Sequence, residues 1–258
     1  MSDRIEPIIL DRVIDLQRRF AGLHSALECC YPIAIVQDEA FQIYDLNDSG
    51  EHYRFIQSAP TAMSIPEGVR AAFTLKAYDG RIACVVTQEV FDEPGGIVTI
   101  LHEFVHCYQY STCEMDLKAE LEIARQAKAT GDAMWELQHP FPYEDQAFTI
   151  PFGCFITISS VGYLGLVDRF QHQLKEALSK PDYEYLVWQE WKEGFARFIE
   201  NRLQLELGLP VNLGGTQQPF TRVSFYAAGA AYIDLIEEES PQLVSDLPSL
   251  FHRMMQPG

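Results

Sequence analysis

The amino-acid sequence predicts an α+β fold, in which an N-terminal helix and a small mixed or antiparallel sheet precede a mainly helical C-terminal half. Two observations lead to this prediction. Short runs rich in β-branched and aromatic residues, separated by turn residues, fill most of the first 95 residues. From residue 97 onward, apolar residues instead recur at the three- and four-residue spacing of helices. Because the sequence contains no internal repeat, we expect residues 1–258 to form a single domain, with an α/β part to about residue 95 and a helical part from about residue 96.

The N-terminal part begins with an expected amphipathic helix over residues 8–29, whose apolar residues recur on one side. The turn Tyr78-Asp79-Gly80 lies between two strand-like runs and is typical of a β-hairpin. In this part we expect strands at residues 33–37, 41–46, 52–57, 71–77 and 81–88.

The C-terminal half begins with an expected helix over residues 97–111 that is apolar nearly all round. The preceding segment, Asp92–Gly96, is typical of a turn into a helix, with Pro94 as a candidate residue of its first turn. Because a helix that is apolar on every side is buried, a polar side chain within it needs a partner. Further helices are expected at residues 115–137, 159–179, 183–207, 221–239 and 242–254.

The first of these helices carries the motif His102-Glu103-Phe104-Val105-His106. Residues four apart share one face of a helix, so the imidazoles of His102 and His106 can reach one metal ion. Zinc binds neutral imidazole nitrogens well, and a glutamate next to the first ligand can accept a proton from water. The motif therefore predicts a zinc site with Glu103 as general base. The alternative is a pair of hydrogen-bonded histidines in the core.

A catalytic zinc site needs a third protein ligand from another element, and a carboxylate is suitable. Glu193 is the leading candidate, and the adjacent Gly194 would let another helix approach closely. Spacing alone leaves open whether Glu193 is a ligand or part of a solvated acidic stripe on an amphipathic helix. The rival ligands are Glu144, Asp145, Glu120 and Glu122.

The motif H-E-F-V-H, followed later by W-K-E-G-F-A-R-F-I-E, resembles the gluzincin zinc metallopeptidases. Among these, the aminopeptidase N-like enzymes and the shorter peptidase MA-like domains are the most similar. The resemblance covers about a tenth of the chain. It implies a zincin-like fold with the active-site helix at the junction of the two halves, and a catalytic Zn²⁺ held by His102, His106 and Glu193, with Glu103 as general base. It also implies an oxyanion donor from a later helix, for which Tyr226 is the first choice. Tyr232 and Tyr143 remain alternatives.

The chain departs from these families in three respects. Residues 107–192 separate the second histidine from Glu193, a longer connection than in the aminopeptidase N-like enzymes, and we expect residues 112–182 to be an inserted pair of helices and a loop. The G-x-M-E-N segment of those exopeptidases is absent, and Lys192 replaces the asparagine often found before the ligand glutamate. Aminopeptidase specificity is therefore not implied.

Composition and charge limit which binding partners and which cellular location we expect. The net charge of −18 argues against nucleic acid and anionic membrane surfaces as partners. No run approaches eighteen apolar residues, so no membrane span is expected. The N-terminus lacks the pattern of a signal peptide, and we therefore expect a cytoplasmic protein with free thiols.

The leading interpretation is a zinc-dependent peptidase that acts on a peptide or protein substrate. The alternative is a zinc-containing, catalytically inactive protein of zincin fold that binds or regulates a protein partner. Hydrolysis of a non-peptide amide or ester is a third possibility.

Overall fold

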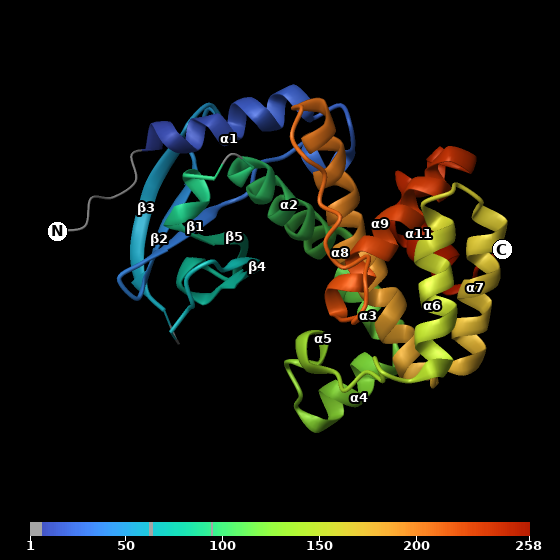
Figure 1. Ribbon diagram of the computed structural model, residues 1–258. Coiled ribbons are helices and arrows are strands. Elements are labelled where there is room, and N and C mark those ends of the chain that lie inside the picture. The colour runs from blue at the N-terminus through green and yellow to red at the C-terminus, as the bar shows by residue number, and fades with distance from the viewer. Residues whose placement is uncertain (1–6, 62–63, 94) are drawn as a thin grey trace. The chain divides into compact units, whose positions relative to one another are not determined.

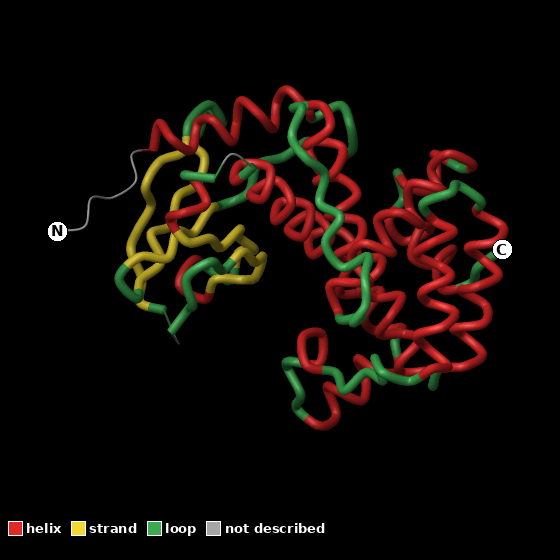
Figure 2. The backbone as a smooth tube through the Cα atoms, viewed as in Figure 1, coloured by secondary structure: helices red, strands yellow, loops and turns green. Residues whose placement is uncertain are grey.

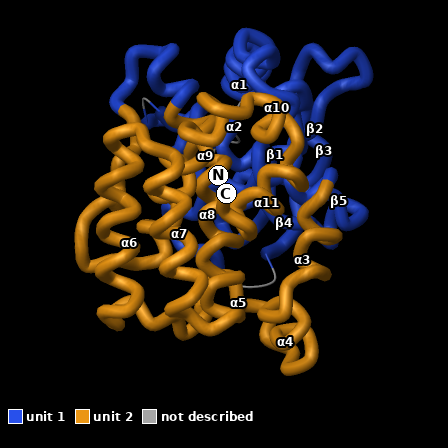
Figure 3. The backbone as a smooth tube through the Cα atoms, turned by 90° about the vertical axis from the view of Figure 1, so that its right-hand side faces the viewer, with its two compact units in different colours: residues 1–112, 202–210 blue, residues 113–201, 211–258 orange. Residues whose placement is uncertain are grey.

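The computed structural model describes residues 7–61, 64–93 and 95–258, and it confirms the α+β class. Strands lie only in the N-terminal part of the described chain, and helices make up the C-terminal half (Figures 1 and 2). The chain forms two compact units (Figure 3). Unit 1 comprises Met1–Thr112 and Arg202–Pro210, and unit 2 comprises Cys113–Asn201 and Val211–Gly258. The single domain expected from the sequence stays a prediction.

The described part of unit 1 contains one five-stranded mixed sheet, with the strand order β3-β2-β1-β5-β4. Neighbouring strands are antiparallel, except that β1 and β5 run parallel. The strands expected from the sequence are all present, with boundaries shifted by three residues at most. They are β1 (Ile33–Gln37), β2 (Ala40–Leu46), β3 (Tyr53–Pro60), β4 (Arg70–Leu75) and β5 (Arg81–Thr87).

Tight turns set the register of the hairpins. The expected β4–β5 hairpin is confirmed, and its turn places Asp79 and Gly80 at φ values of 51° and 69°. A second hairpin joins β1 to β2 through Asp38 and Glu39, which also have positive φ values. Such turns favour asparagine and glycine, which explains why the sequence did not indicate this one.

Both faces of the central strands are buried. On one face, residues of β1, β2, β4 and β5 form an apolar cluster, whose buried members are Ala34, Phe41, Ile43, Leu75, Ala83 and Val85. The alternate residues Ile33, Ile35 and Cys84 are also fully buried. The helix α1 (Pro7–Phe20) contacts β3, and α2 (Gly96–Gln109) contacts β4 and β5. The helix expected over residues 8–29 is therefore too long, because the chain leaves the helix after Phe20 and forms only a short 3-10 turn at Ser25–Leu27.

Unit 2 consists of helices and connecting loops, with no strand among its described residues. Its elements are α3 (Met115–Glu120), α4 (Glu122–Thr130), α5 (Trp135–Gln138), α6 (Gln146–Ser159), α7 (Leu164–Ala177), α8 (Lys180–Glu206, whose last five residues belong to unit 1), α9 (Arg222–Glu239), α10 (Pro241–Val244) and α11 (Leu247–Met255).

Three expectations for this part of the chain are wrong. The helix expected at residues 242–254 is divided into α10 and α11. The single helix at residues 115–137 is divided, because Leu121 is extended and Gly131 ends α4 with a φ of 72°. The pair of helices expected within residues 112–182 is instead the five helices α3 to α7. The structure places α6 where no helix was expected, and this helix contains Pro151.

Helix α8 is the centre of unit 2. From Tyr183 to Glu200 its residues are buried or half-buried, although several are charged. The Glu184 carboxylate, for example, accepts a hydrogen bond of 2.9 Å from the amide of Ile123 in the first turn of α4. Such a bond satisfies one of the donors that the start of a helix leaves unpaired. The polar groups of α8 thus help to hold neighbouring helices in place.

Helices α8 and α9 cross with their backbones in contact. A Cβ atom added at Gly194 would lie 2.7 Å from the Cα of Gly229. A Cβ atom added at Gly229 would lie 2.1 Å from the backbone oxygen of Glu190. Only glycine fits at these two positions, which confirms that the small residue beside Glu193 allows close approach of another helix.

Four charged side chains form a cluster inside unit 2, here called the four-charge cluster: Glu114, Lys118, Glu136 and Lys192. Each lysine nitrogen lies within 2.9 Å of a carboxylate oxygen of both glutamates. The indole of Trp188 also donates a hydrogen bond of 3.1 Å to Glu136. The cluster joins the start of α3 to α5 and α8.

Acid is expected to destabilise the protein through Glu136. Burial alone would raise the pKa of this carboxyl group, but the charges of Lys192 and Lys118 outweigh burial and hold the pKa at about 2. A carboxyl group with a lowered pKa in the folded state stabilises the protein above its unfolded pKa, near 4.5. That contribution, on the order of 3 kcal/mol, disappears as the pH falls from about 4.5 towards 2. Urea denaturation between pH 6 and pH 3 measures it.

The variant Glu136→Gln keeps the shape of the side chain and loses its titration. We expect the free energy of unfolding to fall less steeply with decreasing pH in this variant than in the wild type. Equal slopes in the two proteins would contradict the assignment.

Candidate metal centre

Helix α2 holds the two histidines of the motif side by side. The helix spans Gly96–Gln109, as the apolar run predicted, and most of its residues are buried. Pro94 lies outside the described residues. The rings of His102 and His106 have their centroids 5.0 Å apart, with an angle of 74° between their planes. His106 is buried and His102 half-buried, so an ion held by both would be partly shielded from water.

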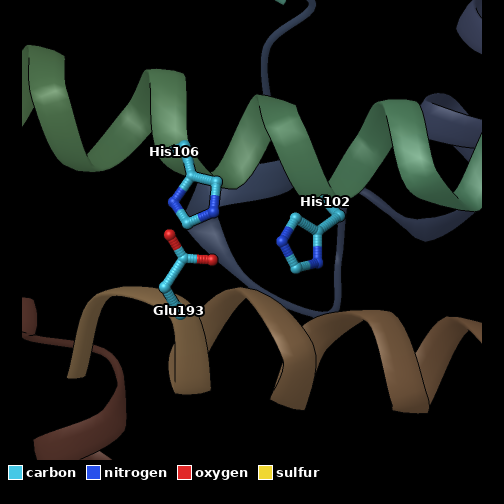
Figure 4. A group of neighbouring side chains, drawn as sticks. All are labelled: His102, His106 and Glu193. Carbon is cyan, nitrogen blue, oxygen red and sulfur yellow. The ribbon is translucent and has the colours of Figure 1, made fainter. Parts of the chain in front are cut away.

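Glu193 of α8 completes a group of three possible metal ligands. One ligand atom each from His102, His106 and Glu193 lie within 4.8 Å of one another (Figure 4). In the described part of the chain, no other group of histidine, cysteine and acidic residues meets this condition. The sequence selected the same three residues.

The rival ligands have other roles. The carboxylate of Asp145 accepts a hydrogen bond from the amide of Ala147 at the start of α6, and Glu144 is exposed. Glu120 lies 2.9 Å from the ring of His252, and Glu122 lies 3.2 Å from the ammonium group of Lys180.

The three side chains suit a zinc ion. Two imidazoles and one carboxylate are a common ligand set of catalytic zinc, which leaves a fourth position for water or substrate. Ligands about 2.1 Å from a tetrahedral ion lie about 3.4 Å apart. The limit of 4.8 Å within which the three ligand atoms lie is about 1.4 Å greater than this spacing.

Gln109 fixes the orientation of the second histidine. Its Oε1 lies 2.8 Å from Nδ1 of His106, one turn further along α2, and both side chains are buried. Because an amide oxygen only accepts hydrogen bonds, Nδ1 carries the proton, and Nε2 keeps a lone pair for a metal. Gln109 is not among the predicted site residues, although its position three residues after His106 indicates such a contact on a helix.

Glu103, the expected general base, is only 5 % exposed. It lies close enough to β5 to affect Cys84, whose pKa is raised by burial and by the charge of Glu103. The structure thus places an acidic side chain one residue from His102 in surroundings that contain little water.

Tyr226, the expected oxyanion donor, lies half-buried on α9 near Glu193. Burial and the charge of Glu193 raise the pKa of its hydroxyl group, against the opposing charges of Arg222 and Arg197. The alternative Tyr232 is fully buried, and its hydroxyl donates to Asp168 and accepts a bond of 2.9 Å from Arg253. Tyr232 is therefore engaged elsewhere.

Tyr143, the other alternative, stacks on Phe225 at a centroid distance of 5.7 Å. Its pKa is raised by burial and by the nearby Tyr185, and the charge of Tyr226 also contributes. Tyr143 therefore belongs to the aromatic side chains that pack around Phe225.

Comparison of the chain with protein-family models, with curated proteins and with solved structures gave no match. Within the described part of the chain, none of the helices combines the length and the apolar composition that crossing a bilayer requires.

Proposed function

We propose that this chain is a zinc-dependent peptidase of the gluzincin type. The proposal rests on one observation: two histidines of an H-E-x-x-H motif and a glutamate 87 positions further along gather into a group that suits zinc. The acidic residue that such chemistry requires as a base lies within the same motif. The resemblance of the segment around Glu193 to the gluzincins supports the same assignment.

His102, His106 and Glu193 would hold the ion. Bound zinc supplies Lewis acidity, which acidifies water and polarises a carbonyl group. Glu103 accepts a proton as the oxygen of water attacks the peptide carbonyl carbon, and returns that proton to the nitrogen when the C–N bond breaks. Tyr226 donates a hydrogen bond to the carbonyl oxygen as negative charge develops there. A tyrosine hydroxyl, whose ordinary pKa is about 10, is protonated at neutral pH and can donate this bond.

Metal content tests the site directly. Purified wild-type protein, supplied with zinc and then washed, is expected to hold about one zinc ion per chain by elemental analysis. Glu193→Ala removes a ligand and should lose the metal. Glu144→Ala removes an exposed carboxylate from a rival position and should keep it. A wild-type protein that holds no zinc would end the proposal.

Cleavage of a peptide library, read by mass spectrometry, tests the activity. We expect cleavage by the zinc-loaded wild type and by Glu144→Ala, and none by Glu193→Ala. A protein that binds zinc through Glu193 but cleaves no peptide would instead fit the alternative, an inactive zinc protein that binds a partner.

A further inference from the structure

Two guanidinium groups lie close to the ring of Tyr226. The Cζ atom of Arg197 lies 5.4 Å from the ring centroid, and that of Arg222 lies 5.6 Å from it. Arg222 is one helical turn before Tyr226 on α9, and Arg197 is one turn after Glu193 on α8. Residues four apart share a helix face, so Arg197 and Glu193 lie on the same side of α8. Two positive charges thus lie near one of the proposed metal ligands, and the carboxylates of Glu200 and Glu193 act on Arg197.

The guanidinium group of Arg197 is buried, and one of its hydrogen-bond donors has no acceptor among the residues that the structure describes. Its side chain is 6 % exposed, and its Nη1 donates a hydrogen bond of 2.7 Å to the backbone oxygen of Gly214. Its Nε is buried and has no acceptor within the described residues. A buried charged donor without an acceptor is costly, and an anionic ligand would remove this cost.

Arg222 lacks a carboxylate partner in the described part of the chain, where its charge faces Tyr226. The chain has 37 acidic and only 19 basic residues, so an arginine without an acidic partner is unusual here. Arg222 is the first residue of α9, and the positive end of a helix dipole adds to the attraction for an anion. Its side chain is half-buried and so remains accessible to a ligand.

We propose that Arg222 and Arg197, which both lie close to Tyr226, bind a carboxylate group of the substrate next to the metal site. Arginine binds carboxylates through paired, charge-assisted hydrogen bonds, which give both strength and orientation. The substrates would be peptides with a carboxylate near the cleaved bond, from the C-terminus or from an acidic side chain. This inference deepens the proposed function and rests on it.

Binding measurements test the inference without requiring turnover. Isothermal titration of the zinc-loaded protein would compare N-acetylphenylalanine with its amide, which differ only in the carboxylate. We expect the acid to bind the wild type at least about tenfold more tightly than the amide. Arg222→Gln should remove this preference, and Arg222→Lys should restore part of it. Arg169→Gln, on the exposed surface of α7, changes the charge equally and should keep the preference.

Cleavage assays distinguish the two sources of the carboxylate. The substrates are one peptide with a free C-terminus, its C-terminal amide, and an amidated peptide with an internal glutamate. Arg222→Gln is expected to raise KM about 10- to 100-fold for the acidic substrates and to leave the neutral amide unchanged. Equal binding of acid and amide by the wild type would overturn the inference, as would an equal loss for all substrates. Because zinc content is measured on the same samples, neither result is confused with loss of the metal.

Discussion

Glu103→Gln is expected to reduce peptide hydrolysis by about 10²- to 10⁴-fold while the protein keeps its zinc. Glutamine has the shape of glutamate but cannot take up a proton from water. The side chain is 5 % exposed, so a smaller residue would leave a cavity that glutamine avoids. Because His102, His106 and Glu193 are unchanged, the metal site should remain intact. Turnover of a cleaved peptide and zinc content by elemental analysis check the two parts of the prediction.

Glu144→Gln is the matched control for this variant. It makes the same chemical change at an exposed position and should retain both activity and metal. Full activity of Glu103→Gln would exclude Glu103 as the base. Loss of zinc from Glu103→Gln would show instead that Glu103 supports the metal site, and the loss of activity would then have another cause.

Gly229→Ala is expected to destabilise the protein by about 3 kcal/mol, the upper end of the usual cost of overpacking a core. The added Cβ atom would lie 2.1 Å from the backbone oxygen of Glu190 and 2.6 Å from its Cα. A backbone cannot rotate away as a side chain does, so α8 and α9 would have to separate. Urea denaturation measures the change in the free energy of unfolding.

Gly165→Ala provides the comparison, because a Cβ atom there meets nothing within 4 Å and the residue lies in α7. This variant should be as stable as the wild type or more stable, since alanine favours helix. Equal free energies of unfolding for Gly229→Ala and Gly165→Ala would contradict the close backbone contact at Gly229. Separation of α8 from α9 would also displace Glu193, three residues after Glu190, so zinc affinity should fall in the molecules of Gly229→Ala that remain folded.

Local sequence signals were sufficient for the elements that depend on local chemistry. The five strands were predicted from β-branched runs and turn residues, and α2 from its continuous apolar run. Helix α6 was missed because Pro151 in its interior argues against a helix, although packing in unit 2 accommodates it. The break at Leu121 was missed because neither glycine nor proline marks it.

Among the site residues, some are likewise predicted by local sequence spacing and others depend on how distant helices pack. His102 and His106 follow from helical spacing alone. Glu193 is 87 positions away from His106, and spacing alone left it open; the resemblance to a family selected it. Arg197 and Arg222 both lie close to Tyr226 because α8 packs against α9. No local pattern in the sequence indicates that contact.

The burial of α8 has a consequence for hydrogen exchange. Amide protons exchange with solvent when a segment opens, and a helix enclosed on all sides opens only when the surrounding structure unfolds. Amides between Tyr183 and Glu200 should therefore exchange only through the unfolding of unit 2, far more slowly than those of the short helices α5 and α10. Glu193 is carried by the segment that opens least often, so its carboxylate should keep its place while the outer helices fluctuate.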